Sequence, residues 1–414
     1  MAPRCLRKRA DLRILVVHNR YQIRAGEDES TDMEIALLRA HGHEVVEYIE
    51  DNRRIERLAA PHLALRTIWS RQSFRQLHHL MRGHRPHIAY FQNIFPLISP
   101  AAYHVAKAEG IPTVQTLRNY RLLCPNALLF RDGHPCEACV ARRVPWPGVV
   151  HGCYRESRAA SAAVAAMLTV HRLIGTWDTK VDIYIALTEF ARQKLIQGGL
   201  PAQKIIVRPN FVHPDPGPAS GHRQYGLFIG RLFPEKGLDT LLAAWKRLKH
   251  HVPLKIVGEG PQQYQCTAQN GAPSTIEWLG RRPLEEVYTL IGSAKFLVFP
   301  STWYEGLPRT IIEAFAKGTP VVASNLGAMS TLVEHGRTGL HFTPADPQDL
   351  AATVDWAWTH PQMMATMGGE ARREYEAKYT AERGYESLMA IFRQATLLMQ
   401  QPPPGPGGGT TDKP

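Results

Sequence analysis

The sequence predicts an α/β protein of two similar domains, each with a parallel sheet covered by helices on both faces. Buried-strand patterns alternate with helical patterns along most of the 414 residues, as expected for repeated βαβ units. One stretch, 204–224, interrupts this alternation with prolines and turn formers, which is typical of an inter-domain connection. The chain is long enough for each series to bury its own core.

The first series follows directly after a basic start. Strand patterns occur at 13–18, 44–50, 87–93, 113–117 and 182–187, and helical patterns at 31–43, 101–110, 158–173 and 189–199. Gly26, in the loop after the first strand, would let a backbone approach a ligand, or it simply permits a turn. That loop lacks the G-x-G-x-x-G fingerprint, so a nicotinamide or flavin enzyme loses its main support. We expect a tail over 1–12 and an α/β domain over 13–200.

The second series follows an expected linker over 201–224. Its strand patterns lie at 225–232, 254–260, 275–280, 295–300, 320–324 and 339–342, and its helical patterns at 238–248, 284–291, 308–317, 347–358 and, as one long helix, about 361–399. We therefore expect a second α/β domain over 225–380 and a C-terminal helix over 381–400. The proline- and glycine-rich end, 401–414, should be disordered because it has too little apolar surface to bury.

The formal net charge is +12 at pH 7, and the first half carries nearly all of it. Residues 1–200 hold 28 Lys and Arg against 18 Asp and Glu, whereas the remainder holds 21 against 19. Such a surface favours an anionic membrane or a phosphate-bearing substrate, with an ordinary solvated face as the alternative. The sequence contains no nucleic-acid recognition module, so we expect no nucleic acid partner.

No apolar run reaches the roughly 20 residues that span a bilayer. The start passes into a strand pattern without the features of a secretion signal. These two observations lead us to expect a cytoplasmic protein.

The stretch from Lys295 to Asn325 reads as strand, loop, helix and strand, with a proline at the helix start and Gly318 just past its end. The loop therefore joins the carboxyl end of a strand to a helix amino terminus, where open α/β sheets bind ligands and phosphate is favoured. Glu305 lies in this loop and Glu313 in the helix. Core packing explains neither acid, because neighbouring residues already supply the apolar face.

A second motif, GRLFPEKG at 230–237, also follows a strand and precedes a helix. Its Arg231 and Lys236 would be cations beside free backbone amides, an arrangement that suits a diphosphate. Two ordinary surface cations are the alternative interpretation. The matching placement of Glu305 in the same domain favours a site.

Together these motifs resemble the retaining glycosyltransferases of family 4. EGLPRTIIEA, with PSTWY before it and GTPVVASNLGAMSTLVEHGRTGL after it, is similar to their signature of two glutamates separated by seven residues. GRLFPEKG resembles the donor-phosphate motif of the family, and RPNFV resembles its domain-linking loop. The resemblance covers about residues 13–395 and is strongest in the second half. It implies the GT-B fold, in which two Rossmann-like domains face each other across a cleft.

The resemblance also implies roles for single residues. Gly26 and Gly230 would lie at the donor, Arg231 and Lys236 would hold its diphosphate, and Glu313 would accept hydrogen bonds from the ribose hydroxyls. Glu305 would contact the transferred sugar, with the amides of Gly306 and Leu307 near the phosphate or sugar. Positive charge and amide donors in a dry cleft would stabilise the departing diphosphate. The family is thought to retain the anomeric configuration by same-face attack and needs no divalent metal or other cofactor for catalysis.

Two departures from the family pattern concern the first domain. Arg118, in TLRNYR, stands where many relatives have a histidine that faces the donor sugar. Arginine is longer and always charged, so the catalytic contact expected there would differ. Ala25 and Gly26 stand where relatives often have two glycines, which affects the detail of that loop but not its location.

Four cysteines form a third group: Cys124, Cys136, Cys139 and Cys153. Their spacing, C-x(11)-C-x(2)-C-x(13)-C, is close to that of four-thiolate zinc sites. Three interpretations stay open: a structural zinc site, ordinary reduced thiols in an irregular loop, and a redox or disulfide role. The segment 124–153 resembles an insert found in a subset of bacterial family-4 enzymes, which would place it in the acceptor domain.

The resulting hypothesis is a glycosyltransferase that moves a sugar from a nucleotide-sugar donor to a glycan or lipid-linked acceptor in cell-surface polysaccharide synthesis. We expect it to be cytoplasmic and peripheral on the inner face of the cell membrane. A sugar-nucleotide epimerase or a phosphorylase of the same fold is one alternative. A non-catalytic nucleotide-sugar-binding subunit is the other.

Overall fold

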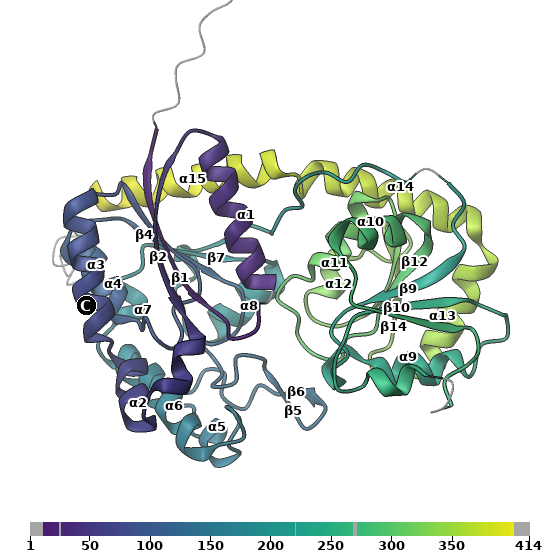
Figure 1. Ribbon diagram of the computed structural model, residues 1–414, viewed down its shortest axis with the longest axis horizontal. Coiled ribbons are helices and arrows are strands. Elements are labelled where there is room, and N and C mark those ends of the chain that lie inside the picture. Colours follow the sequence, from purple (N-terminus) through teal and green to yellow (C-terminus); the bar gives the residue numbers. More distant parts are fainter. Residues whose placement is uncertain (1–10, 25, 220, 268–270, 401–414) are drawn as a thin grey trace, which may run out of the picture.

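The computed structural model describes residues 11–24, 26–219, 221–267 and 271–400. Within them the chain forms two lobes, each a twisted sheet with helices on both faces (Figure 1). Most of the expected basic tail and the proline- and glycine-rich end over 401–414 lie outside the described residues.

The first lobe is built on a six-stranded sheet of order β2-β1-β3-β4-β7-β8. All its strand pairs are parallel. Its strands are β1 (Arg13–Arg20), β2 (Glu44–Asp51), β3 (Ile88–Phe91), β4 (Thr113–Leu117), β7 (Ile183–Ala186) and β8 (Ile205–Val207). Its helices are α1 (Gly26–Ala40), α2 (Ala60–Ile68), α3 (Arg71–His84), α4 (Ala101–Ala108), α5 (Trp146–Val150), α6 (Arg158–Leu173), α7 (Thr176–Thr179) and α8 (Glu189–Gln197). A small hairpin, β5 (Phe130–Arg131) and β6 (His134–Pro135), projects from this lobe.

The second lobe contains another six-stranded parallel sheet, of order β11-β10-β9-β12-β13-β14. Its strands are β9 (Tyr225–Ile229), β10 (Leu254–Val257), β11 (Ile276–Gly280), β12 (Ala294–Phe299), β13 (Val321–Ser324) and β14 (Gly339–Phe342). Its helices are α9 (Leu238–Trp245), α10 (Leu284–Ser293), α11 (Arg309–Ala316), α12 (Met329–Leu332), α13 (Pro347–Thr359) and α14 (Pro361–Lys378). The strand order reverses between β9 and β12, which is where open α/β sheets bind ligands.

The structure differs from the sequence-based expectation in three places in the first lobe. Helix α1 begins at Gly26 rather than Thr31, because the acidic side chains of its first turn suit a helix amino terminus. Helices α2 and α3 lie between the strand patterns at 44–50 and 87–93, where the sequence indicated no helix. Strand β8 lies within the stretch expected as linker, yet it pairs with β7 as the sheet edge.

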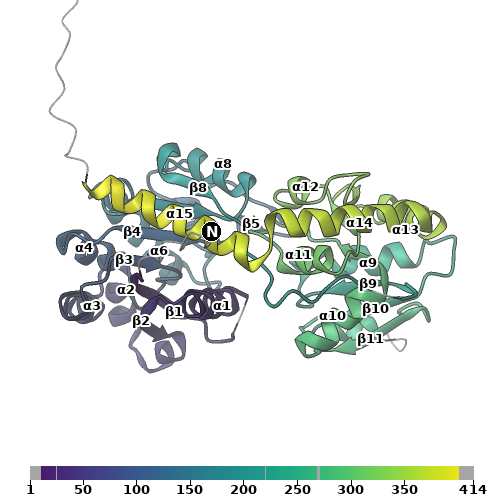
Figure 2. The same cartoon turned by 90° about the horizontal axis from the view of Figure 1, so that it is seen from above.

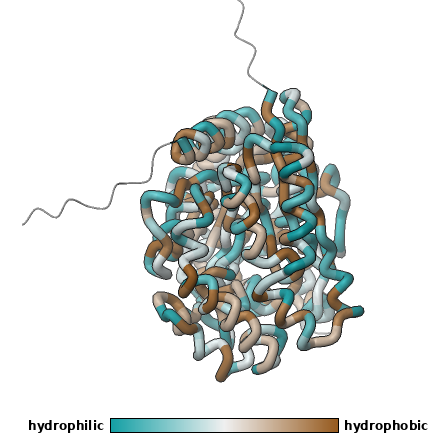
Figure 3. Tube along the Cα trace, turned by 90° about the vertical axis from the view of Figure 1, so that its left-hand side faces the viewer, coloured by the Kyte–Doolittle hydropathy of each residue, from teal (hydrophilic) through white to brown (hydrophobic). Residues whose placement is uncertain are grey.

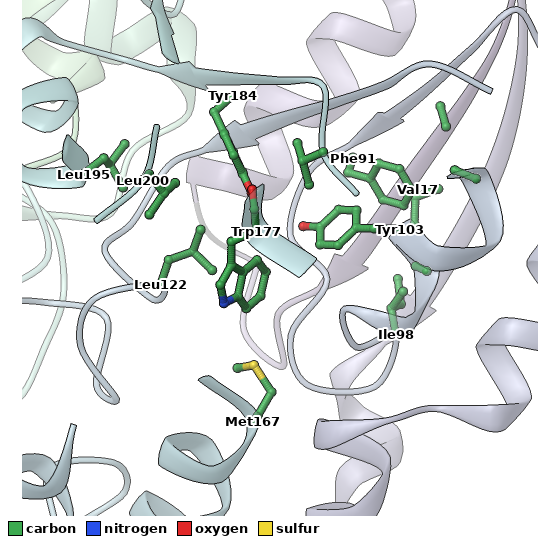
Figure 4. Close-up of a cluster of buried hydrophobic side chains, with 14 of the residues drawn as sticks. Val17, Phe91, Ile98, Tyr103, Leu122, Met167, Trp177, Tyr184, Leu195 and Leu200 are labelled. Atoms are coloured by element: carbon green, nitrogen blue, oxygen red, sulfur yellow. The ribbon is translucent and has the colours of Figure 1, made fainter. Parts of the chain in front are cut away.

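Both faces of the first sheet are packed with apolar side chains. On one face Phe91, Tyr103, Trp177 and Tyr184 lie together (Figure 4), and the Tyr184 hydroxyl donates to the Trp177 carbonyl at 2.8 Å. This bond gives a buried polar group the partner that it needs away from water. Hydrophobic and hydrophilic residues are interspersed along the trace (Figure 3). In the described residues no helix is both long and apolar enough to cross a membrane.

The long helix expected over about 361–399 is wrong, because two helices cover this stretch: α14 and α15 (Ala381–Gln400). The backbone between them pairs with the inter-domain connection: the Val212 amide donates to the Tyr379 carbonyl at 3.0 Å, and Val212 and Thr380 form a parallel bridge. Helix α15 then packs on the first lobe, where its Tyr385 and Phe392 join the core behind β1 and β3. The two helices thus run across both lobes (Figure 2).

A buried ionic network, called the clamp below, ties the inter-domain connection and helix α15 to the first lobe. Arg208, in the connection, is only 1% exposed and donates to Glu34 of α1 at 2.5 Å and to the Gly384 carbonyl of α15 at 3.1 Å. The second Glu34 oxygen accepts from Tyr90 and Gln92. Burial by itself would raise the pKa of Glu34, but the nearby guanidiniums outweigh burial and the net shift is downward.

Arg208→Met should destabilise the protein strongly, because it leaves the Glu34 carboxylate buried without its main counter-charge. We expect a loss of roughly 3–5 kcal/mol in the free energy of unfolding, measured by urea titration. Arg383→Met removes an exposed ion pair with Glu386 and is the matched control, with an expected change within about 0.5 kcal/mol. Equal losses of stability in the two variants would contradict the stabilising role of the Arg208–Glu34 clamp.

The pH dependence of this contribution has a definite sign. The folded-state pKa of Glu34 lies below its ordinary value of 4.5, so the stabilisation is fully present above that value and is lost as the pH falls through the lowered pKa. The stability difference between the wild type and Glu34→Gln should therefore narrow in acid. Urea titrations repeated below about pH 4 measure this narrowing.

Candidate functional site

Two loops meet at the switch point of the second sheet. One follows β9 and is the predicted GRLFPEKG motif, and the other follows β12 and precedes α11. The strand, loop, helix, strand order predicted for Lys295–Asn325 is thereby confirmed. Gly237 has φ +75°, and a Cβ there would lie 1.9 Å from the Pro300 carbonyl oxygen. Only glycine permits this approach, which locks the two loops together.

The structure brings Lys236 and Glu305 together in this contact. Glu305 Oε1 accepts from Lys236 Nζ at 2.6 Å, from Ser301 Oγ at 2.8 Å and from Trp303 Nε1 at 2.8 Å. Glu305 is 6% exposed, so the carboxylate is held firmly by three donors in a place that excludes most water. The Lys236 ammonium also lies 5.3 Å from the centre of the Trp303 ring.

Glu313 lies one element further on, buried within α11. Its Oε1 accepts from Arg309 Nη2, one turn earlier, at 3.1 Å, and Arg309 Nη1 reaches Glu29 of the first lobe at 2.8 Å. Burial raises the pKa of Glu313, and Arg309 offsets this only in part. Arg309 therefore stands between an acid of each lobe.

The first lobe closes directly over the loop that carries Glu305. The Tyr120 hydroxyl donates to the Glu305 carbonyl at 3.4 Å, and the Thr188 hydroxyl donates to the Gly306 carbonyl at 3.4 Å. A Cβ on Gly306 would come within 2.8 Å of the Arg118 carbonyl oxygen. A side chain at 306 would push the lobes apart, so Gly306 is required for this close approach.

The Arg118 side chain, in contrast, is not directed at Glu305. It lies in the first lobe, where it forms an ion pair with Glu34 at 3.3 Å and donates to Gln92 and to Asn210 of the connection. Its side chain is only 4% exposed. The family resemblance predicts an Arg118 side chain that faces the donor sugar in the second lobe. In the structure only the Arg118 carbonyl lies beside the second lobe, at Gly306.

The remaining predicted residues are spread around this centre. Arg231 shares the loop of Lys236, but its side chain is 61% exposed and pairs with Glu235 at 3.5 Å. Leu307 is buried in the loop just before α11, and Gly230 packs its backbone against Gly258. Gly26 begins α1, and a Cβ on it would meet no atom within 4 Å.

Sequence reasoning missed several residues of the site. Arg309 precedes Glu313 by one helical turn, which is the spacing of a helix ion pair and was available as a signal. Glu29, Tyr120 and Thr188 carry no such signal, because their partners lie far away in the sequence and meet them only in the closed arrangement of the two lobes.

An open pocket lies at the carboxyl end of β1 and β2 in the first lobe. It has a volume of about 220 Å³, and three arginines and three aspartates are among its lining residues: Arg20, Arg24, Arg53, Asp28, Asp32 and Asp51. The opposite charges offset one another. The pocket can therefore hydrogen-bond a polar ligand without requiring a particular net charge.

The four cysteines of the sequence motif line one small cavity. They are free thiols, and burial raises the pKa of Cys124 and Cys153 and raises that of Cys139 to about 11. In the part of the chain that the structure describes, no group of three or more His, Cys, Asp or Glu stands ready to hold a metal ion.

The second lobe matches a known family. Residues 214–374 match the family model described as Glycosyl transferases group 1. An uncharacterized glycosyltransferase of Methanocaldococcus jannaschii is 24% identical over 320 residues, which cover 75% of this chain and 83% of that protein. Glycogen synthase of Mycobacterium tuberculosis is 30% identical over 182 residues, 42% of this chain and 44% of that enzyme. The chain thus spans less than half of that relative.

Two solved structures share the fold across nearly the whole chain. Alr3699/HepE of Anabaena, in complex with UDP and glucose, has a TM-score of 0.65 at 18% identity and covers 92% of this chain and 99% of that one. Sucrose-phosphate synthase of Thermosynechococcus elongatus has a TM-score of 0.67 at 16% identity and covers 94% of this chain and 100% of that one. The predicted GT-B fold is confirmed.

The pairing of Lys236 with Glu305 can be measured by a double-mutant cycle. Lys236→Met should cost about 1–3 kcal/mol of unfolding free energy, because it removes the counter-charge of a buried carboxylate, and less in a Glu305→Gln background. Urea unfolding of the four proteins gives the coupling energy. The exposed pair Arg282 and Glu286, 3.9 Å apart, is the control and should show almost no coupling; a similarly small value for Lys236 and Glu305 would contradict their contact.

Proposed function

We propose that the chain is a glycosyltransferase that transfers a sugar from a nucleotide-sugar donor with retention of configuration; the match of its second lobe and its relatives support this proposal. The observation that carries this proposal is the meeting of Lys236 and Glu305 at the switch point, with Glu313 on the adjoining helix. The two acids have the spacing of the family signature, and the cation comes from the second motif. The UDP complex of the structural neighbour supports a nucleoside diphosphate as the carrier.

In this reaction the bond between the sugar C1 and the diphosphate oxygen breaks, and a bond from C1 to an acceptor hydroxyl oxygen forms. The acceptor proton passes to the departing diphosphate on the same face of the sugar, so the products are a glycoside and a nucleoside diphosphate. Negative charge grows on the diphosphate as the bond breaks. Lys236 and the backbone amides that begin α11 would stabilise that charge where water is excluded.

Lys236 and Glu305 would change partners when the donor binds. The diphosphate competes for the Lys236 ammonium, while Ser301 and Trp303 continue to hold the Glu305 carboxylate. Glu305 is then positioned to contact the sugar. Glu313 would accept hydrogen bonds from ribose hydroxyls, a role that requires the carboxylate to exchange its bond with Arg309.

Arg118 would act by positioning rather than by touching the sugar. Its guanidinium is held by Glu34, Gln92 and Asn210, and its carbonyl supports the close approach at Gly306. Arg231 is exposed and would have to turn inward to reach the diphosphate. Gly26, with open space beside it, would admit the donor near the start of α1.

We assign the acceptor, a glycan or a lipid-linked sugar, to the first lobe. The pocket after β1 and β2 lies at the carboxyl ends of these strands and offers both charged donors and acceptors to sugar hydroxyls. In this proposal the enzyme acts in polysaccharide synthesis at the inner face of the cell membrane, without a metal ion in catalysis.

An exposed apolar patch supports the membrane assignment. Trp146 is 52% exposed and Leu173 is 76% exposed, with Val144 and Ile174 also exposed. Arg172 donates to the carbonyls of Arg142 and Arg143, which places the two ends of the patch side by side. Aromatic and apolar side chains next to arginines suit the interface of an anionic bilayer, where each basic residue contributes about 1 kcal/mol.

Lys236→Ala and Glu313→Ala should each remove donor binding and transfer while the protein stays folded. Loss of a contact to the departing diphosphate typically costs a factor of about 100 or more. Calorimetry with UDP measures binding, and NMR of the product, after a panel of nucleotide sugars has been screened by thermal shift, gives both rate and anomeric configuration. Short assays with EDTA should leave the rate unchanged.

Lys246→Ala and Glu285→Ala are matched controls, because both side chains are exposed in the same lobe. They should retain wild-type binding and rate. Full activity in Lys236→Ala and Glu313→Ala would overturn the site. An altered free sugar without an acceptor would indicate an epimerase, a dependence on inorganic phosphate would indicate a phosphorylase, and donor binding without any turnover would indicate a binding subunit.

Binding to vesicles should depend on the apolar patch. Co-sedimentation with vesicles of anionic lipid should be strong at low salt and weak with neutral vesicles. The double variant Trp146→Ser, Leu173→Ser should lose at least about tenfold in partition, since both side chains give up apolar burial. Met363→Ser alters an exposed methionine of the other lobe and should bind as the wild type does; equal binding of all three proteins would refute the membrane surface.

A further inference from the structure

The segment between Tyr120 and Ser157 is the least regular part of the described chain. Its helices and strands are limited to the short hairpin β5–β6 and the five-residue helix α5. Six non-glycine residues in it have positive φ: Ala127, Leu129, Asp132, Ala141, Arg155 and Glu156. Such conformations cost free energy and persist only where the surroundings hold them in place. Few backbone ladders are available here to do so.

Four thiols provide a means of holding this segment. Cys124, Cys136, Cys139 and Cys153 all line one small cavity of about 10 Å³, which is roughly the room of a single water molecule or ion. Cys124 and Cys139 are buried and the other two are partly buried, and none forms a disulfide. The cavity contains no acidic side chain that would favour a hard cation such as Ca²⁺ or Mg²⁺ over a soft one.

The surroundings of the cavity suit a negatively charged centre. Arg131 lines it, and electrostatic interactions couple Arg121 to Cys124 and Arg172 to Cys139. Backbone amides of Asn126 and Leu129 hydrogen-bond to Cys124, and that of Gly148 does so to Cys139. Four thiolates with one Zn²⁺ carry a net charge of −2, which cations and amide donors stabilise.

We propose that Cys124, Cys136, Cys139 and Cys153 bind one structural zinc ion that fixes this segment of the acceptor-side lobe. Each thiol releases its proton and forms one bond to the metal, which gives a closed tetrahedral site. Because the side chains do not stand as a ready group, binding requires the sulfur atoms to turn inward by rotation about Cα–Cβ. Cys124 then gives up its bond to the Asn126 amide oxygen.

The metal also braces the candidate active site. Glu137 lies between the two central cysteines, and its Oε1 accepts from Tyr304 at 2.9 Å and from Lys194 at 2.7 Å. Tyr304 precedes Glu305 in the loop of the second lobe. When both cysteines bind the same zinc ion, the turn from Cys136 to Cys139 holds Glu137 rigid. The hydrogen bond between Glu137 and Tyr304 then restrains the loop of the second lobe.

Elemental analysis of tag-free protein from zinc-supplemented cells tests the site directly. We expect about one zinc per chain in the wild type, and less than about 0.2 in Cys136→Ser and in Cys153→Ser. Cys266→Ser is the matched control, because Cys266 is a buried thiol of the other lobe. The Cys266→Ser protein should retain about one zinc per chain. These readouts do not depend on activity, so they hold whether or not the proposed reaction is found.

Should the cysteine variants not fold, zinc release from the wild type replaces them. Titration with a mercurial reagent should free the metal as four thiols react. A chromogenic chelator measures the released zinc, and circular dichroism reports whether the protein stays folded.

Hydrogen exchange tests whether the zinc site restrains the active-site loop. Removal of zinc should speed amide exchange in 301–307, and Glu137→Ala should do the same with zinc retained. Folded protein with little zinc, a disulfide among these cysteines, iron in place of zinc, or equal metal loss in Cys266→Ser would overturn the proposal.

Discussion

The contact between Gly237 and Pro300 is the constraint on which the candidate site depends. Because β9 and β12 are neighbours in the sheet although distant in sequence, the loops that follow them emerge side by side. A Cβ at 237 would overlap the Pro300 carbonyl oxygen, so the loops can interlock only with glycine there. That interlock sets Lys236 against Glu305 at 2.6 Å, and the proposed contacts to the diphosphate and the sugar use this pair.

The first lobe is built against the same loop. Tyr120, Thr188 and the Arg118 carbonyl all touch the backbone of Glu305 or Gly306. These contacts involve carbonyl groups rather than the Glu305 carboxylate, whose donors all come from the second lobe. The first lobe therefore positions the backbone of the loop, while side chains of the second lobe hold the Glu305 carboxylate.

The sequence was sufficient to predict the two sheets, the two loops and the placement of Glu305 and Lys236, because strand and helix periodicities and turn residues are local signals. It was not sufficient for Arg118, whose partner Glu34 comes from another element and draws the side chain away from the cleft. The break between α14 and α15 agrees with the expected C-terminal helix over 381–400, but the helical pattern over about 361–399 shows no interruption there. No proline marks it, and the helix stops because the Tyr379 carbonyl accepts from Val212 of the connection.

The two crossings between the lobes limit how the cleft can open. The connection and the turn between α14 and α15 pair side by side at Val212 and Thr380, and Arg208 binds both the first lobe and α15 through Glu34 and Gly384. Rotation of the lobes must therefore take place on the second-lobe side of this clamp. Separation of the lobes would break the Arg309–Glu29 pair, in which the Glu29 side chain is 48% exposed and the Arg309 side chain only 14%. The Arg208 network is buried, whereas Tyr120 and Thr188 contact the loop through hydrogen bonds of 3.4 Å, so the lobes would separate more easily at the loop than at the crossings.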